Sequence, residues 1–385
     1  MRPKGKRIAM KTFCMKNLGR AACLALIQGL GAVVLSSGTA WAGWEERFTQ
    51  PPAEARILKI IHNWPDQPEA QDQLSSRLRT QGFGGVVCNV SFDQYLESDA
   101  KWRAFARAVN EAKRAGTGSQ TRSFAFGGPL ALWLYDERGY PSGNAGGVTL
   151  RDHPDWEARG LLVADTEAQG GPVTLELAPG KLVLAGAFPV RDGNIDMTQK
   201  VDLAAAVQDG KLNWQAPAGR WRVLAVTEDR LYEGTHAEGN LHARIPYVNL
   251  LMPEPTARFV EVTYGGYAKY LGDDLGKYFM ATFTDEPSLM SLFLRPMPYR
   301  SLPWAPNLPT EFQKRRGYAL DAALLPALVA EAGSAGAKIR YDFWLTVGEL
   351  VSENYFGQIQ TRCRQLRVPS GGHLLAEEGI VGLVP

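Results

Sequence analysis

Short apolar runs alternate with amphipathic stretches in the first part of the chain. Runs rich in β-branched and aromatic residues at 57–63, 85–91 and 130–137 predict three buried strands. Between them, residues 68–82 and 99–116 carry apolar side chains at helical spacing. Because strands that alternate with helices form parallel sheets, this pattern indicates βαβ units.

The pattern changes at about residue 160. Helical periodicity disappears as far as residue 231, and Pro-Gly, Asp-Gly and Ala-Gly turns separate short apolar runs. Four of these runs predict strands, at 173–177, 182–188, 211–215 and 221–226. Residues 160–231 are therefore predicted to form a small inserted β-domain. It divides the parallel-sheet domain into a first part, residues 43–159, and a continuation, residues 232–385.

Helices and strands alternate again after residue 231. Helical patterns occur at 254–271, 310–317, 320–332 and 339–366. Strands are predicted at 278–287 and 372–379, and a proline-rich loop at 294–309. This gives about five barrel-type strands, whereas a closed barrel needs eight. The predicted fold class is α/β, of the (β/α)8 TIM-barrel type, incomplete, with an inserted β-domain. An unclosed sheet exposes its edge, so we expect these residues alone to be poorly soluble and inactive, as a fragment or a truncated gene product.

The N-terminal segment, residues 1–42, has the features of a secretory signal peptide. Seven basic residues and no acidic ones precede an apolar run at 21–35, and Ala40-Trp41-Ala42 forms an A-x-A cleavage site before Gly43. The run is shorter than the roughly 20 residues that a spanning helix needs, so we expect no stable membrane anchor. The predicted location is secreted or periplasmic.

Charge and cysteine content exclude several classes of function. The whole chain has a net charge of +2, but without residues 1–42 it has 35 basic and 40 acidic residues, or −5. Such a protein has no general attraction for nucleic acid. Cys88 and Cys363 are predicted to be free thiols, and no metal-binding or nucleotide-binding motif occurs. We therefore expect no cofactor, although a cluster of acids could hold Ca²⁺.

Each predicted strand begins apolar and ends polar. The ends read His62-Asn63-Trp64, Asn89-Val90-Ser91, Tyr135-Asp136-Glu137, Thr284-Asp285-Glu286 and Glu377-Glu378. Active sites of barrels of this type lie at the carboxyl ends of the strands. The gradient therefore places the candidate chemistry at one end of the sheet.

Alternation along each strand predicts which side chains point into the barrel. Inward positions on the second, third and fifth strands include Asn89, Trp133, Tyr135, Glu137, His373 and Glu377. On the strand at 278–287 we expect Phe279, Ala281 and Phe283 to face the helices. Its other row, Thr282, Thr284 and Glu286, is then expected to face the barrel mouth.

Glu137, Glu286 and Glu377 are the predicted catalytic residues. Glycoside hydrolysis needs two carboxyl groups, one protonated and one ionised. Predicted substrate-binding residues are Asn63, Trp64, Asn89, Trp133, Tyr135, Asp136, Tyr140, Asp285 and His373. Simpler interpretations exist for each motif: Asp285-Glu286-Pro287 suits a helix N-terminus, Glu377-Glu378 a solvated end, and the aromatic residues core packing.

Several of these motifs resemble a group of large bacterial glycosyl hydrolases. They are WLYDERGYPSGNAGG (133–147), HPDWEARGL (153–161), YVNLLMPEPT (247–256), FTDEPSL (283–289) and SGGHLLAEEG (370–379). The group is similar to the α-L-rhamnosidases of glycoside hydrolase family 106. The resemblance implies a (β/α)8 barrel with a β insertion, and it supports Glu286 as the acid/base residue.

The predicted function is a secreted glycoside hydrolase that acts on polysaccharide or glycan side chains, with α-L-rhamnosides as candidate substrates. Glu286 would be the general acid, and Glu377 or a residue on a strand beyond these five would be the base or nucleophile. Carbohydrate is the expected partner. Two alternatives stay open: an inactive or truncated carbohydrate-binding relative, and a barrel lyase or phosphate-ester enzyme.

Overall fold

The computed structural model describes residues 44–49, 51, 55–116, 130–231, 246–287, 289 and 299–374. The predicted signal peptide, residues 1–42, and the predicted catalytic residue Glu377 lie outside these residues. Among the helices within them, none is both long and apolar enough to cross a bilayer.

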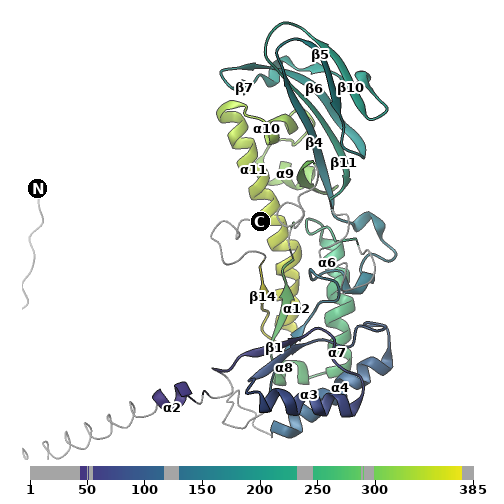
Figure 1. Cartoon of the computed structure of the whole chain (residues 1–385), viewed down its shortest axis with the longest axis vertical. Helices are drawn as coiled ribbons and strands as arrows, with labels where there is room; N and C mark the ends of the chain where they lie inside the picture. Colours follow the sequence, from purple (N-terminus) through teal and green to yellow (C-terminus); the bar gives the residue numbers. More distant parts are fainter. Residues whose placement is uncertain are drawn as a thin grey trace, which may run out of the picture.

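A parallel sheet occupies the lower half of the molecule in Figure 1. Its strands are β1 (Leu58–Ile61), β2 (Gly85–Cys88), β3 (Ala131–Tyr135), β12 (Phe279–Asp285) and β14 (Gly372–His373). They lie in chain order, and every neighbouring pair is parallel. The sequence located all five strands, and the observed ones are shorter. The fold is therefore mixed α/β, with a curled sheet of five consecutive parallel strands.

The short last strand depends on a glycine. Gly372 pairs with Thr284 of β12 and has a φ of +153°. A Cβ atom at Gly372 would lie 2.0 Å from the carbonyl oxygen of Thr284. Only glycine allows this close approach together with that backbone conformation. Gly372, the second glycine of the SGGH run, is thus required for β14 to join the sheet beside β12.

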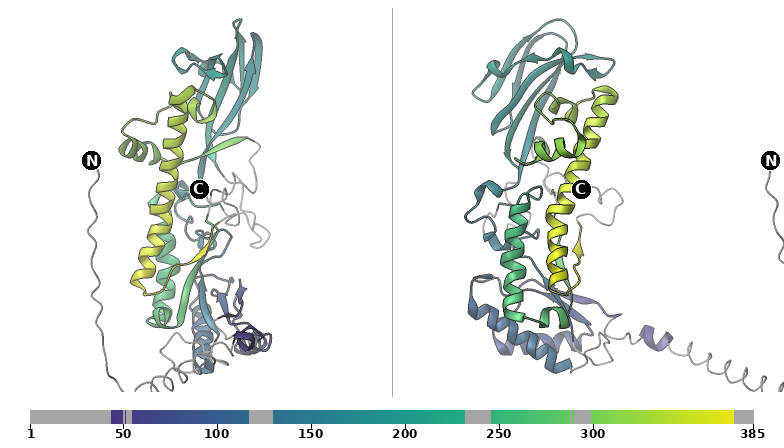
Figure 2. Two further views of the ribbon diagram at one scale, coloured as in Figure 1. Left: turned by 90° about the vertical axis from the view of Figure 1, so that its left-hand side faces the viewer. Right: turned by 180° about the vertical axis from the view of Figure 1, so that it is seen from behind.

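Helices cover one face of the parallel sheet. The crossovers α3 (Pro68–Thr80) and α4 (Asp99–Gly116) join the first three strands, as predicted. Two long helical columns lie side by side, as the right-hand view of Figure 2 shows. One consists of α6 (Pro253–Phe259), η6 (Val260–Tyr264) and α7 (Gly265–Leu271), and the other of α11 (Gly333–Val351), η8 (Ser352–Gly357) and α12 (Gln358–Gln365). Each column contains one π-helical segment, η6 or η8. The remaining helices are α2 (Trp44–Thr49), α8 (Asp274–Tyr278), α9 (Leu308–Arg316) and α10 (Leu325–Val329).

Antiparallel strands form the other end of the molecule (Figure 1). The larger sheet has the order β13 (Arg300–Trp304), β4 (Arg159–Ala168), β11 (Trp221–Arg230), β6 (Lys181–Arg191) and β7 (Asn194–Ile195), with β8 (Val201–Asp202) also paired to β6. A three-stranded sheet, β5 (Gly171–Glu176), β10 (Lys211–Ala216) and β9 (Val207–Gln208), packs on it through a separate apolar core.

Four strands of the larger sheet were not predicted, and two of them are the two-residue strands β7 and β8. Strand β4 was missed, and the predicted proline-rich loop at 294–309 contains β13. Strand β13 pairs antiparallel with β4, with Leu302 opposite Leu161. These strands are stabilised by hydrogen bonds to segments far away in the sequence, so the local pattern does not predict them.

The alternation prediction holds on β3 and, on β12, for Phe279, which packs in the main core; it fails on β12 beyond the register shift that follows Phe279. On β3, Leu132 and Leu134 belong to the main core against the helices, whereas Trp133 and Tyr135 lie on the opposite face. On β12, Phe283 packs on that opposite face with Tyr135, so the prediction that it faces the helices is wrong.

Thr282 and Thr284 face the helices instead of the barrel mouth. Thr282 contacts Cys363 of α12, and Thr284 bonds Tyr355 of η8. The physical reason is a register shift in the β3–β12 pairing between Phe279 and Ala281, which exchanges the two faces.

Candidate active site

A row of rings crosses the helix-free face of the parallel sheet. The centroids of His62 and Tyr135 lie 5.3 Å apart, those of Tyr135 and Phe283 5.5 Å, and those of Phe283 and His373 4.8 Å. These residues come from β1, β3, β12 and β14 or directly follow them. The carboxyl ends of four strands therefore meet in one aromatic surface, as expected for the mouth of a parallel α/β sheet.

The Tyr135 hydroxyl lies between two carboxyl groups at this edge. It is within hydrogen-bond distance of Glu137 Oε2 and lies 2.6 Å from Asp285 Oδ2. A phenol has one proton to donate, so it serves only one of the two oxygens at a time. The other contact is favourable when one carboxyl carries a proton. Two carboxyl groups and one phenol are thus arranged so that they can share protons.

Burial keeps Glu137 protonated at neutral pH. The side chain is 5% exposed. Burial, the largest cause, raises the pKa of Glu137 to about 8, and the charges of Asp285 and Asp136 add to this, against the hydrogen bond from Tyr135. No Lys or Arg of the described residues forms an ion pair with Glu137. A carboxylic acid with this pKa can donate a proton at physiological pH.

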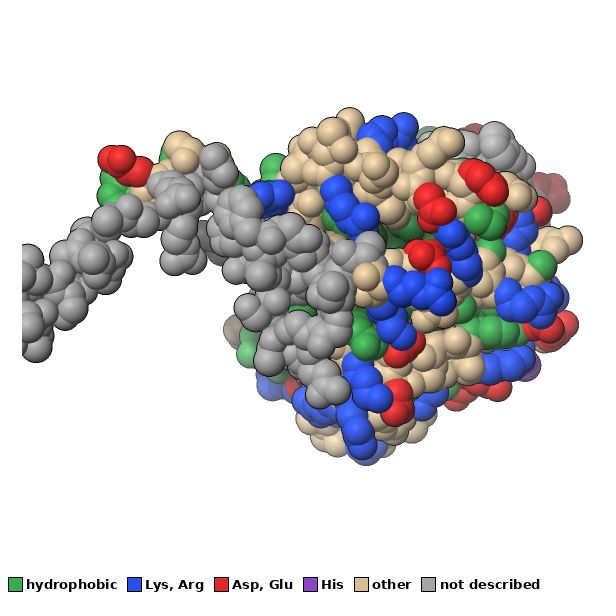
Figure 3. Space-filling view, turned by 90° about the horizontal axis from the view of Figure 1, so that it is seen from below, with side chains coloured by type: hydrophobic (Ala, Val, Ile, Leu, Met, Phe, Trp, Pro, Cys, Tyr) green, Lys and Arg blue, Asp and Glu red, His purple; other side chains and the backbone are tan. Residues whose placement is uncertain are grey.

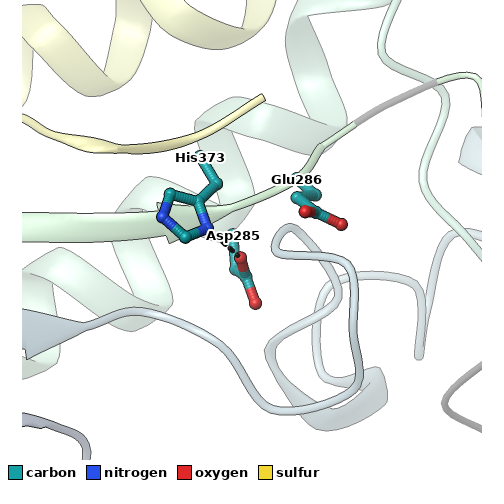
Figure 4. A group of neighbouring side chains, drawn as sticks. All are labelled: Asp285, Glu286 and His373. Atoms are coloured by element: carbon teal, nitrogen blue, oxygen red, sulfur yellow. Dashed lines mark ion pairs between the residues drawn. The ribbon is translucent and has the colours of Figure 1, made fainter. Parts of the chain in front are cut away.

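Asp285, Glu286 and His373 lie next to one another (Figure 4). Each offers one ligand atom, and these atoms lie within 4.8 Å of one another. His373 Nδ1 is 3.8 Å from Asp285 Oδ1. Two carboxylates and an imidazole could hold a divalent cation, Ca²⁺ through the carboxylate oxygens. All three residues were predicted as site residues, and the structure brings them together.

The backbone of Glu286 explains why it joins Asp285. In a regular strand, adjacent residues point to opposite faces. Glu286 has a φ of +45°, which is uncommon for any residue but glycine. Its N–H donates to the carbonyl of His373 at 3.1 Å. The left-handed turn ends β12 and places the Glu286 side chain beside that of Asp285.

Asp136, predicted to bind substrate, is instead a buried structural acid. It is 0% exposed. Ser142 Oγ donates to its Oδ1 at 2.6 Å, and the Tyr264 hydroxyl donates to its Oδ2 at 2.5 Å. Burial raises the pKa of Asp136 to about 7, although these hydrogen bonds oppose the rise. Strand alternation is the reason: Asp136 follows Tyr135 and points to the helix side, away from the mouth.

Ser142 connects this buried acid to Asp285. Its Oγ accepts the backbone N–H of Asp285 at 2.8 Å, and its own N–H donates to the Asp285 carbonyl at 2.9 Å. The loop after β3 is thereby fixed to the end of β12. Asp136 and Ser142 position the backbone of Asp285 without facing the mouth.

Trp64 does not line the mouth as predicted. It is 5% exposed and belongs to the main hydrophobic core. Burial removes the apolar ring of Trp64 from water, which is favourable. Trp64 directly follows His62 and Asn63, the polar residues at the end of β1. Trp133 lies on the mouth side, where it packs near Phe283. Tyr140 packs partly buried against the main core.

The two predicted asparagines make structural bonds. Asn63 Oδ1 accepts the N–H of Phe92 at 2.8 Å. Asn89 is 0% exposed, and its amide donates to the carbonyl of Glu137. Its Oδ1 is buried and has no hydrogen-bond partner among the described residues. Asn89 therefore orients the chain at Glu137 rather than reaching the open mouth.

Sequence reasoning missed four residues of this region: His62, Ser142, Tyr264 and Tyr355. Ser142 stands in the Pro-Ser-Gly run already singled out, and His62 precedes Asn63 at a strand end. Both could have been found from position. The tyrosines gave no such signal, because an aromatic residue on an amphipathic helix normally indicates core.

Charges elsewhere on the surface are mixed in sign. Figure 3 views the molecule from below and shows Lys and Arg side chains interspersed with Asp and Glu. Many form ion pairs, such as Arg107 with Asp72 and Lys113 with Asp274. This face has no large patch of one sign that would attract a polyanion.

Comparisons with known proteins found similar sequences and a similar structure. A family model described as alpha-L-rhamnosidase, glycoside hydrolase family 106, matches residues 185–371. A protein of Formosa agariphila with the name "Putative beta-glucuronidase" is 22% identical over 205 residues, which are 52% of this chain and 16% of that protein. A solved rhamnosidase from Novosphingobium sp. PP1Y is similar with a TM-score of 0.48 and 14% identity, over 86% of this chain and 47% of that one. The chain thus spans less than half the length of these relatives. Over residues 185–371, which include the FTDEP motif, this chain is similar to the glycosyl hydrolases of family 106.

Proposed function

We propose that the protein hydrolyses O-glycosidic bonds in polysaccharide or glycan side chains. The observation that carries the proposal is the cluster at the carboxyl end of the parallel sheet. There Glu137 and Asp285 share the Tyr135 hydroxyl, and Glu286 lies beside Asp285. Glycoside hydrolysis needs one protonated and one ionised carboxyl group. The raised pKa of Glu137 supports such a division.

Glu286 is the proposed general acid. It is partly exposed, whereas Glu137 is buried, so Glu286 is better placed to reach a glycosidic oxygen. Asp285 presents a carboxylate next to it. The Tyr135 hydroxyl contacts both Asp285 and the buried Glu137, so Glu137 and Tyr135 lie directly behind Asp285. Glu377, predicted as the second catalytic carboxylate, stays a candidate for base or nucleophile.

The larger setting is also a proposal. Five consecutive parallel strands support a (β/α)8 barrel, which three more strands would close. Residues 160–231 are proposed as a β-domain inserted into it. Residues 1–42 have the composition of a signal peptide, so we propose export to the periplasm or the medium. α-L-Rhamnosides are the first substrates to test, because the family model carries that description.

The test uses Glu286→Gln in the full-length gene product. Two α-L-rhamnosides are compared: one with an alcohol leaving group and one with an activated aryl leaving group. We expect kcat/KM to fall by about 10²–10⁴ for the first, because loss of a positioned general acid costs this much. The fall should be far smaller for the second, which departs without a proton.

The matched control is Glu176→Gln, the same change at an exposed glutamate on β5. It should retain wild-type turnover on both substrates. Melting curves of both variants should match the wild type. Near-normal hydrolysis of the alcohol glycoside by Glu286→Gln would exclude the proposed role, and absence of activity on every glycoside tested would exclude the proposed function.

A further inference from the structure

A cavity lies far from the candidate active site. It has a volume of about 460 Å³, within the roughly 300–1,000 Å³ typical of small-molecule sites. One wall is the larger antiparallel sheet, and the other is formed by α10 and the start of α11. Among the elements that line it, β7, α10 and the upper part of α11 lie in Figure 1 at the end of the molecule opposite β1.

Hydrogen bonds hold the two walls together. The N–H of Ile195 on β7 donates to the carbonyl of Glu331 at 2.7 Å, and the N–H of Gly333 donates to Asn194 Oδ1 at 2.8 Å. Arg300 on β13 donates to the carbonyl of Val329 at 3.0 Å. Three bonds across the gap fix its width. The cavity is therefore preformed and requires no rearrangement to admit a ligand.

The cations of the lining are all paired. Arg222 bonds Asp165 and, at 3.1 Å, Glu167. Arg300 lies 3.3 Å from Asp165, and Arg340 lies 2.8 Å from Glu331. An anionic ligand would have to displace these carboxylates. A hydroxyl group has no such conflict, because it donates to a carboxylate and accepts from a guanidinium at the same time.

The remaining lining is apolar and includes one large ring. Val163, Ile195, Leu302 and Leu328 are buried side chains that contribute to it, and Trp344 on α11 is a partly buried indole. A pyranose has hydroxyls at its rim and C–H groups on its faces. Paired charges at one wall and an indole at another match these two kinds of surface.

From this chemistry we infer that the cavity binds a neutral pyranose sugar and so provides a carbohydrate site separate from the proposed catalytic mouth. The inference goes beyond the proposed function and does not require it, since binding here involves none of the residues of the mouth.

Titration calorimetry on the full-length gene product tests the inference. Methyl α-L-rhamnopyranoside, other neutral methyl pyranosides, methyl β-D-glucuronide and inorganic phosphate are compared. Glu286→Gln serves as the background to prevent turnover. A neutral pyranoside should bind at a site that Trp344→Ala weakens by about two- to tenfold. Val190→Trp, which fills the cavity, should abolish that binding.

Tyr341→Ala is the matched control. Tyr341 is an exposed aromatic residue on the same helix and does not line the cavity. Its loss should leave pyranoside binding unchanged. With Glu286 intact, the Trp344 and Val190 variants should keep wild-type turnover of a small aryl glycoside.

Three results would overturn the inference: no neutral pyranoside binds outside the mouth, binding is unchanged in folded Trp344→Ala and Val190→Trp, or phosphate or glucuronide binds there more tightly. Each is distinguishable from failure of the proposed function, which is measured separately as hydrolysis.

Discussion

Asp165 in the antiparallel sheet and Glu137 at the end of the parallel sheet are both largely removed from water, but their neighbours differ. Asp165 lies between the guanidinium groups of Arg222 and Arg300. Glu137 contacts the hydroxyl of Tyr135 and lies near the carboxylate of Asp285. No cation of the described residues pairs with it.

The difference shows what each region can do. Asp165, through its ion pairs with two arginines, contributes to the structure of the sheet. An acid buried beside another acid has its pKa raised, and it becomes able to hold and release a proton near neutral pH. At the carboxyl end of the parallel sheet, the buried Glu137 lies beside another acid, an arrangement that is unfavourable for stability. Functional sites commonly show such local costs.

The largest expected effect contrasts the two acids directly. Glu137→Gln should lower kcat/KM for an unactivated glycoside by roughly 10² or more, because Asp285 loses its proton-sharing partner. Asp165→Asn, the equivalent change in the antiparallel sheet, should leave kcat/KM within about twofold. Steady-state kinetics on both variants measure this. If Glu137→Gln and Asp165→Asn lowered kcat/KM equally, the carboxyl cluster would have no special role in catalysis.

The pH dependence of stability sharpens the same contrast. The pKa values of Asp136, about 7, and Glu137, about 8, are raised from ordinary values of 3.8 and 4.5. The folded state then binds protons more tightly than the unfolded state, so the free energy of unfolding falls as pH rises through this window. Denaturant unfolding between pH 4 and pH 9 should show the fall. The double variant Asp136→Asn, Glu137→Gln should flatten it, and Asp165→Asn should not.

Ser142→Ala tests how the mouth is positioned. It removes the hydroxyl that accepts the Asp285 N–H and donates to Asp136. Because Asp136 stays fully buried and the Asp285 N–H partly so, the free energy of unfolding should fall by about 1–3 kcal/mol. Thr174→Ala removes an exposed hydroxyl bond on β5 and should cost less than about 0.5 kcal/mol. A Ser142 variant as stable as the Thr174 variant would contradict the inference that Ser142 fixes the loop after β3 to the end of β12.

The smallest effect is expected for Asp165→Asn itself. Its partners are partly exposed, and asparagine keeps one oxygen acceptor of similar shape. The free energy of unfolding should fall by about 1 kcal/mol or less. A larger loss, measured by denaturant unfolding at neutral pH, would show that the antiparallel sheet depends on its ion pairs more than the comparison assumes.

The sequence by itself determined where the parallel strands lie and that their polar ends meet. Apolar runs separated by helical patterns located all five strands, because the local order of apolar and polar residues indicates buried strands and amphipathic helices. The faces of β3 followed from alternation for the same reason. Glu137, Asp285, Glu286 and His373 were identified as site residues from their positions alone.

Only the tertiary structure decided how these residues face one another. The register shift before Ala281 reversed the faces of β12, and the left-handed backbone of Glu286, bonded to His373, turned its side chain toward Asp285. Likewise, Asp136 was buried against Ser142 and Tyr264 while its neighbour Glu137 reached the mouth. These outcomes depend on partners far along the chain. A local pattern specifies the strand, but it does not contain the hydrogen bonds that shift and end it.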